Sequence, residues 1–146
     1  MNILANFSER LNELLSEHGY TTKSLHEKTG IPVSVINKYR NGTVAPSVEA
    51  ALRLAELFCC SLDYLLGRKE DSRVRSFHAC PPFGGRLIFL LLENHCSQYK
   101  LCKDANISSS VLRHWLNGTH VPSLDNVVKL ADFFGCSADY VLGREK

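Results

Sequence analysis

Apolar side chains recur at helical spacing through the N-terminal half of the chain. Leu11, Leu14 and Leu15 share one face of a first helix, for which Ser8 is placed as the N-terminal cap and Gly19 as the stop. Further helices are expected at about 22–29, 32–40, 48–58 and 62–66, each beginning near a cap residue or a proline. The pattern therefore predicts five short helices around one apolar core.

The second half of the chain repeats this pattern. Shifting the sequence by 76 positions aligns residues 7–68 with residues 83–144 without a gap, and about 25 of roughly 62 aligned pairs are identical. The segment between the copies is charged and polar at first and ends in Pro81-Pro82, as a linker should. We therefore expect an all-α protein with two tandem five-helix domains, at 1–69 and 83–146, joined by a linker at 70–82.

The turn between the second and third helices of each copy indicates a specific motif. A sharp helix-turn-helix angle needs a residue that accepts a left-handed backbone, and glycine does so without a steric penalty. The first copy has Gly30 there, and the second copy has Asn106, the residue type that tolerates this conformation next best. Both copies are therefore expected to place these residues in a left-handed turn.

The first helix of the second copy is more apolar than one core requires. Residues 86–93 carry apolar side chains nearly all round, although a surface helix needs only one apolar stripe. Ile88, Phe89 and Leu92 should therefore be covered by something outside their own domain. The partner surface is either the other domain of the same chain or a second chain, and a homodimer is the version we expect.

Composition limits the function without identifying it. Apolar residues make up 45% and charged residues 22% of the chain, as in ordinary globular proteins. The formal net charge is only +2, so any DNA-binding face must arise from local clustering of basic residues. The N-terminal segment lacks a basic region followed by a long apolar run, and we expect a cytoplasmic protein that does not enter the membrane.

Neither metal chemistry nor catalysis is indicated. The six cysteines include no Cys-x-x-Cys pair, and in a chain without an export signal they are expected to be reduced thiols. Cys60 and Cys136 occupy equivalent positions in the repeat, which suits a small buried apolar residue better than a ligand. No nucleophile–base pair, phosphate-binding glycine loop or carboxylate pair is evident. We expect no enzymatic activity, metal, cofactor or small-molecule substrate.

Both copies resemble the phage-repressor and Cro type of helix-turn-helix domain, the XRE-like family, almost from end to end. In the first copy the resemblance is carried by Leu25, Gly30-Ile31, Ile36 with Tyr39, Asn41-Gly42, Pro46-Ser47 and the ending SLDYLLGR. In the second copy it is carried by Leu101, Asn106-Ile107, Leu112 with Trp115, Asn117-Gly118, Pro122-Ser123 and SADYVLGR. A single helix-turn-helix window is a weak signal, but five helices in the right order, found twice, are a strong one.

The resemblance implies a transcription regulator, expected to be a repressor, that binds double-stranded DNA. In this family the third helix enters the major groove and its exposed residues reach the base edges. By position, the candidates for base-edge contact are Val33, Ser34, Asn37, Lys38, Ser109, Ser110, Arg113 and His114. The candidates for phosphate contact are Thr22, Lys23, Arg40, Asn41, Thr43, Gln98, Lys100, Asn117, Thr119 and His120.

Structural roles compete with these assignments. Asn41-Gly42 and Asn117-Gly118 also serve as helix stops, and Lys38 and Arg113 could be ordinary surface charges. Tyr39 and Trp115 are interpreted as core aromatic residues beneath the third helix, not as platforms for base stacking. The alternative function is a protein-interaction or antitoxin-like module in which one helix-turn-helix copy serves dimerisation.

Overall fold

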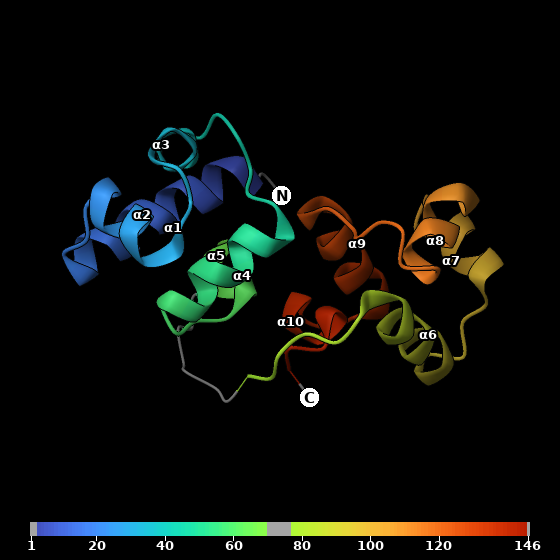
Figure 1. Cartoon of the computed structure of the whole chain (residues 1–146). Helices are drawn as coiled ribbons and strands as arrows, with labels where there is room; N and C mark the ends of the chain where they lie inside the picture. Colours follow the sequence, from blue (N-terminus) through green and yellow to red (C-terminus); the bar gives the residue numbers. More distant parts are fainter. Residues whose placement is uncertain (1–2, 70–76, 146) are drawn as a thin grey trace. The chain divides into compact units, whose positions relative to one another are not determined.

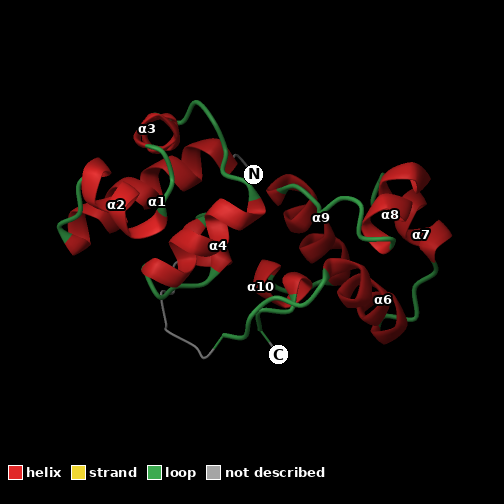
Figure 2. Cartoon of the chain, viewed as in Figure 1, coloured by secondary structure: helices red, strands yellow, loops and turns green. Residues whose placement is uncertain are grey.

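The computed structural model describes residues 3–69 and 77–145 of the chain. These residues form ten helices and contain no strand (Figures 1 and 2). The chain divides into two compact units, Met1–Arg75 and Ser76–Lys146, called domain 1 and domain 2 below. Each is considered by itself. None of the described helices combines the length and apolar character that crossing a membrane would need.

The two domains have the same order of helices. Domain 1 contains α1 (Ile3–His18), α2 (Thr22–Thr29), α3 (Val33–Arg40), α4 (Val48–Leu57) and α5 (Leu62–Leu65). Domain 2 contains α6 (Phe83–Glu93), α7 (Gln98–Asp104), α8 (Ser109–Leu116), α9 (Leu124–Phe134) and α10 (Ala138–Leu142). The predicted all-α fold with two five-helix domains is confirmed.

Hydroxyl side chains begin most of the helices. In domain 1 the side chains of Thr21, Ser47 and Ser61 each accept a backbone N–H of the first turn, and in domain 2 those of Ser97, Ser108, Ser123 and Ser137 do so. These bonds satisfy donors that the start of a helix would otherwise leave without partners. Three cap positions are therefore common to both copies, whereas Ser108 stands where domain 1 has Pro32, which makes no side-chain cap bond.

The expected cap at Ser8 is wrong. Helix α1 begins at Ile3, and Ser8 lies inside it, where its hydroxyl donates to the carbonyl of Arg40 at 2.7 Å. No proline stands between residues 3 and 8 to stop the helix, whereas Pro82 is the residue before α6 in the second copy. The two copies therefore share the body of their first helix but not its start.

A buried ion pair ties down the C-terminal end of each domain. In domain 1 Arg68 Nη1 lies 3.3 Å from Asp63 Oδ1, and in domain 2 Arg144 Nη1 lies 2.8 Å from Asp139 Oδ1. Each carboxylate stands in the first turn of the short last helix, where a negative charge suits the helix dipole. The pair is thus a duplicated element of the core.

The last part of the expected linker packs on domain 2. The amide of His78 donates to the carbonyl of Arg144 at 2.7 Å, and the Arg144 guanidinium lies 3.9 Å from the centre of the Phe77 ring. Residues 70–76 of the expected linker lie outside the described residues. The described end of the linker is therefore held by the same arginine that forms the buried ion pair.

Candidate nucleic-acid interface

The turn before the third helix has the predicted backbone in both domains. Gly30 has φ +77° and Asn106 has φ +55°, so both are left-handed, as expected. In domain 1 the His26 ring nitrogen Nδ1 lies 2.7 Å from the carbonyl oxygen of Ile31, which fastens α2 to the turn. The turn at Gly30 sets the angle between α2 and α3, and the turn at Asn106 sets the angle between α7 and α8.

The outer faces of α3 and α8 are mostly polar and open to solvent. Seven of the candidates for base-edge contact are exposed: Val33, Ser34, Asn37, Lys38, Ser109, Ser110 and Arg113. The opposite faces supply the core through Ile36 and Tyr39 in α3 and through Leu112 and Trp115 in α8. Each helix therefore rests on its apolar side and presents hydrogen-bonding groups on the other.

Aromatic pairs hold these helices against the first helix of each domain. Phe7 and Tyr39 meet edge to face with ring centres 5.6 Å apart, and Phe83 and Trp115 do so at 6.0 Å. Tyr39 is 5% exposed and Trp115 is 2% exposed, so neither ring is available to stack on a base. Burial also raises the pKa of the Tyr39 phenol. The interpretation of both rings as core residues agrees with this packing.

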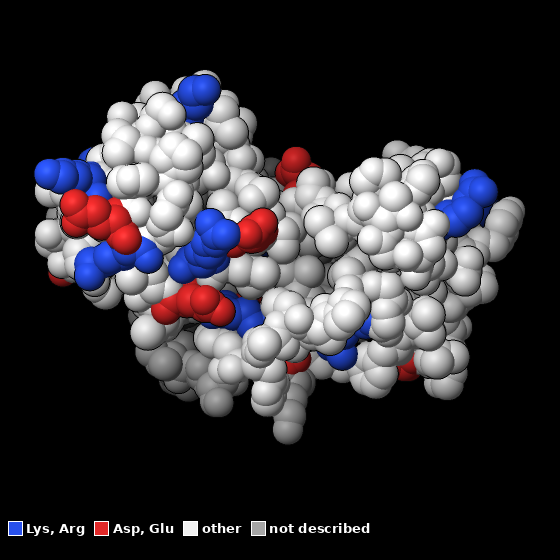
Figure 3. All heavy atoms as spheres, viewed as in Figure 1, with Lys and Arg blue, Asp and Glu red and all other residues white. Residues whose placement is uncertain are grey.

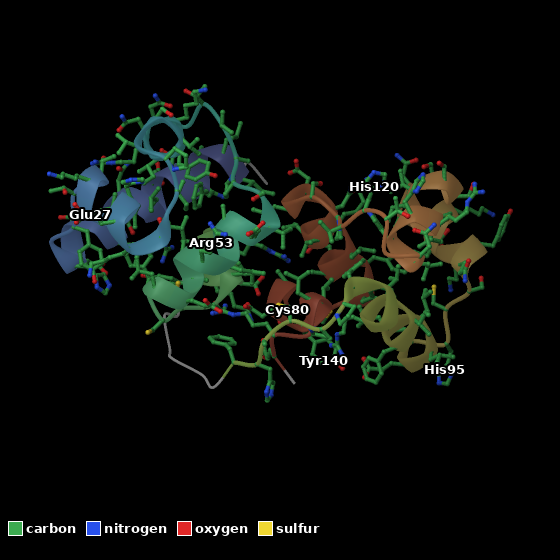
Figure 4. All side chains as sticks on the ribbon, viewed as in Figure 1. Glu27, Arg53, Cys80, His95, His120 and Tyr140 are labelled. Carbon is green, nitrogen blue, oxygen red and sulfur yellow. The ribbon has the colours of Figure 1, made fainter. Side chains whose placement is uncertain are left out.

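His114 differs from the other candidates. Its ring is half-buried and meets the ring of His120 edge to face at 4.7 Å, and its buried Nδ1 has no hydrogen-bond partner. Figure 4 labels His120 in the loop that follows α8. The histidine pair joins α8 to the next loop, so His114 is less accessible than Lys38 at the equivalent position.

The loops after α3 and α8 have the same local structure. Asn41 Oδ1 accepts the amide of Thr43 at 3.1 Å, and Asn117 Oδ1 accepts the amide of Thr119 at 2.9 Å. Each asparagine oxygen also accepts the hydroxyl of the same threonine. These bonds fix the loop in an Asx turn and keep the four side chains exposed. The candidate phosphate-binding loops are therefore ordered by their own residues.

A hydrogen-bonded arginine lies where the first three helices of domain 1 meet. Arg40, at the end of α3, donates through Nε to Asn12 Oδ1 at 2.8 Å and through Nη1 to Thr22 Oγ1 at 2.9 Å. Asn12 in turn donates to the Arg40 carbonyl at 3.0 Å. Both acceptors of the guanidinium are neutral, and in the described part of the chain no carboxylate pairs with it. A positive charge is thus held in a fixed, exposed position beside the N-terminal end of α2.

At the equivalent edge of domain 2, two of the three residues are apolar. Ile88, Gln98 and Leu116 stand where domain 1 has Asn12, Thr22 and Arg40. The space between α7 and α8 is an open groove of about 440 Å³, lined by Gln98, Tyr99, Cys102, Ser109, Leu112, Arg113 and Leu116. Domain 2 therefore lacks the fixed charge that domain 1 places at this edge.

Sequence reasoning identified Arg40 and Thr22 but missed Ser8 and Asn12, which hold the end of α3. Both are polar residues on a helix face, a pattern that ordinary solvent exposure also produces. A comparison of the two copies could have identified them. The second copy has Gly84 in place of Ser8 and Ile88 in place of Asn12, and it also has Leu116 in place of Arg40. Because all three residues differ between the copies, the sequence indicates that Ser8, Asn12 and Arg40 act together in domain 1.

Charged side chains also differ between the visible faces of the two domains. Figure 3 shows lysine, arginine and acidic residues over much of domain 1, and a broad uncharged surface on domain 2. In residues 3–69 and 77–145, no three histidine, cysteine or acidic side chains come together in a way that could hold a metal ion.

Comparison with family models agrees with the two-domain pattern. Residues 10–71 match the model described as a Cro/C1-type helix-turn-helix DNA-binding domain. Residues 88–141 match a second model, described as helix-turn-helix. No solved structure gives a significant match to the chain.

Three similar proteins are named as regulators. The chain is 35% identical over 65 residues to the HTH-type transcriptional regulator ImmR of Bacillus subtilis, covering 44% of this chain and 51% of that protein. It is 34% identical over 65 residues to the uncharacterized HTH-type transcriptional regulator YobD of the same organism, covering 44% of this chain and 58% of that protein. A putative HTH-type transcriptional regulatory protein of Pyrococcus furiosus is 38% identical over 50 residues, which are 34% of this chain and 16% of that protein. The chain thus matches about half the length of its two Bacillus relatives.

Proposed function

Since the chain belongs to the Cro/C1, or XRE-like, type of tandem helix-turn-helix proteins, we propose that it is a sequence-specific DNA-binding transcription regulator that acts as a repressor. Proteins of this type are typically not enzymes, and the similar proteins are named as transcriptional regulators. The third helix of each domain reads base edges in the major groove, through the exposed residues of α3 and α8. A second copy of the chain is the expected partner for a two-fold operator.

The observation that carries this proposal is the fixed arginine of domain 1. Arg40 is held by two neutral acceptors beside the start of α2, and Lys23 is exposed on the first turn of that helix. The positive end of a helix dipole, a fixed guanidinium and a lysine suit one DNA phosphate. Such a contact would orient α3 so that Asn37 and Lys38 face the base edges.

Fewer features of domain 2 support DNA binding. Its recognition helix presents Arg113, and its edge presents Lys100, but Leu116 replaces the fixed arginine and Tyr99 replaces Lys23. We therefore propose that domain 1 supplies most of the affinity for DNA and that domain 2 adds a different, weaker set of contacts. The second candidate function, an interaction module built on one helix-turn-helix copy, is favoured only for domain 2.

Binding to DNA selected from a random pool tests the proposal. Fluorescence anisotropy measured at several salt concentrations should show an affinity that falls as salt rises, because bound phosphates release counterions. Lys38→Ala and Arg113→Ala should change the preferred base at different positions, each by about 1–3 kcal/mol if the contact is to a base edge. Binding that is absent at low salt would refute the proposal, and equal losses on every sequence would assign both side chains to phosphate.

A further inference from the structure

Helix α6 has a second apolar face that points away from the core of its own domain, and on this helix the Arg86 guanidinium lies 4.8 Å from the centre of the Phe89 ring. Its core face consists of Phe83, Leu87, Leu90 and Leu91, all buried. On the other side Ile88 is 48% exposed, Phe89 is 46% exposed and Leu92 is 72% exposed. Together with Gly85 they follow the spacing i, i+3, i+4, i+7, which makes one continuous stripe along the helix. The residues Gly85, Ile88, Phe89 and Leu92 are called the α6 stripe.

The duplicated domain shows that the fold does not need this stripe. The equivalent residues on α1 are Glu9, Asn12, Glu13 and Ser16, all polar. Domain 1 reaches the same five-helix structure with Glu9, Glu13 and Ser16 exposed and Asn12 half-buried against Arg40, so the common fold does not require apolar residues at these positions. Apolar side chains exposed as a continuous stripe indicate a surface that is covered by another molecule or domain.

Domain 1 offers no matching surface in its described part. Its large exposed apolar side chains are Leu4 on α1, Val33 on α3 and Val44 in the loop after α3. They stand on three separate segments and form no stripe along one helix. The partner of the α6 stripe must therefore bring its own row of apolar side chains at helical spacing.

The charges beside the stripe identify such a partner. Arg86 and Glu93 lie on one flank of α6, two turns apart, next to the same residue of α10. Arg86 donates to the Tyr140 carbonyl through Nε at 3.0 Å, and the Tyr140 hydroxyl donates to Glu93 at 2.6 Å. Tyr140 is labelled beside α6 in Figure 4. The bond to Glu93 is also the main cause that raises the pKa of Tyr140.

When two copies of a helix pack antiparallel about a two-fold axis, each flank meets the same flank of the other copy in reverse order. Arg86 then faces Glu93 of the second copy at one end of the contact, and the reverse pairing forms at the other end. The stripe meets itself in the middle through Ile88 and Phe89, and Gly85 lies at its end, where a Cβ would touch nothing within 4 Å in the same chain. The flank charges are therefore complementary to those of a second α6.

We propose that the α6 stripe is a homodimer interface, in which two copies of α6 pack antiparallel about a two-fold axis. The interface joins domain 2 of one copy to domain 2 of the other, because α6 belongs to domain 2. It rests on the second copy that the proposed function expects and specifies where that copy binds. Its test is self-association without DNA, so it can fail while DNA binding holds. In a DNA-binding regulator it would supply the two-fold pairing of two α3 helices.

Domain 1 shows which side chains can replace the α6 stripe without disturbing the fold. The triple variant Ile88→Asn, Phe89→Glu and Leu92→Ser gives α6 the side chains that α1 has at the same positions. We expect the full-length protein to sediment as a dimer and the triple variant as a monomer with unchanged helical circular dichroism. The dimer dissociation constant should rise on the order of a hundredfold or more, because three apolar side chains lose their partner.

A charge reversal tests the antiparallel arrangement. Glu93→Arg should weaken the dimer, because it places two positive charges opposite each other at both ends of the contact. Glu17→Arg is the matched control, since Glu17 holds the equivalent position on α1 and should have no effect. A Glu93→Arg variant that dimerises as well as the wild type would overturn the antiparallel contact.

Two results would overturn the homodimer itself. The first is a wild-type protein that remains monomeric at every concentration up to its solubility limit. The second is a triple variant that still dimerises while keeping its helical content. If a monomeric wild type shows slow hydrogen exchange in α6 that the triple variant loses, the stripe docks within its own chain and the second copy is the wrong partner.

Discussion

Domain 1 and domain 2 share one backbone plan but differ at two surfaces. Where domain 1 holds Arg40 between Asn12 and Thr22, domain 2 has Leu116, Ile88 and Gln98, and Leu116 and Gln98 line an open groove. Where α1 is polar on its outer face, α6 carries an exposed apolar stripe. The core ion pair, the aromatic pair and the left-handed turn are retained in both. The interior is thus common to the two copies, while these two surfaces differ.

The largest effect on stability, and the largest difference in that effect between the two domains, is expected when the buried ion pair is broken. Asp139→Ala should destabilise domain 2 by about 3–5 kcal/mol, because it leaves Arg144 with 4% of its side chain exposed and without this carboxylate. Asp63→Ala should cost less, since Arg68 is 14% exposed and water can reach it more easily. Hydrogen exchange resolved by peptide measures each domain in the full chain. Equal losses in the two domains would contradict the expected difference in burial.

The second largest difference in stability is expected at the contact between the first and third helices of each domain. A Cβ at Gly84 would lie 2.6 Å from the backbone oxygen of Leu116, so Gly84→Ser should destabilise domain 2 by about 1–3 kcal/mol through overpacking. Ser8→Gly, the reverse change, should cost domain 1 about 1 kcal/mol by removing the bond to the Arg40 carbonyl. Urea denaturation measures both. If Gly84→Ser has no cost, the two helices can separate and the copies are interchangeable at this contact.

The fixed arginine should make the domains unequal in DNA binding. Arg40→Leu gives domain 1 the residue of domain 2 and should weaken binding on the order of tenfold, while lowering the salt dependence by about one phosphate contact. Arg53→Leu is the matched control, because Arg53 is exposed on α4 and paired with Glu49 at 2.6 Å. Anisotropy titrations at several salt concentrations measure both variants. Similar losses from the two variants would mean that Arg40 acts only through net charge.

Leu116→Arg is the converse substitution and should restore little affinity. The new guanidinium would meet Ile88 in place of Asn12, so one of its two fixing hydrogen bonds has no acceptor. A gain as large as the loss from Arg40→Leu would show that the arginine needs no support from its neighbours.

The smallest effects are expected where one copy has glycine and the other does not. His95 has φ +52°, and its counterpart Gly19 has φ +67°. His95→Gly should stabilise domain 2 by about 1 kcal/mol, because glycine accepts this backbone without strain, and Gly19→His should destabilise domain 1 by a similar amount. Thermal unfolding measures both changes. Asn106→Gly should gain less than His95→Gly, since asparagine tolerates the left-handed region better.

Features that depend on neighbouring residues could be predicted from the sequence. The spacing of leucines, the serine and threonine caps and the Gly30 or Asn106 turn predicted ten helices in two copies, because helix periodicity, capping and turn geometry act over a few residues. The start of α1 was the exception. Ser8 is a good cap residue, yet the chain before it contains nothing that stops a helix, and its hydroxyl found a partner on α3 instead.

Features that depend on packing emerged with the tertiary structure. Arg40 and Asn12 are 28 positions apart, and Arg40 and Thr22 are 18 apart, so no local rule links them. The sequence showed that the residues around Ile88 are too apolar for one core, but the contacts of α6 with its own domain separate Leu87, Leu90 and Leu91 from Ile88, Phe89 and Leu92. Local chemistry specifies where helices form, whereas their packing decides which side chains meet and which remain exposed for a partner.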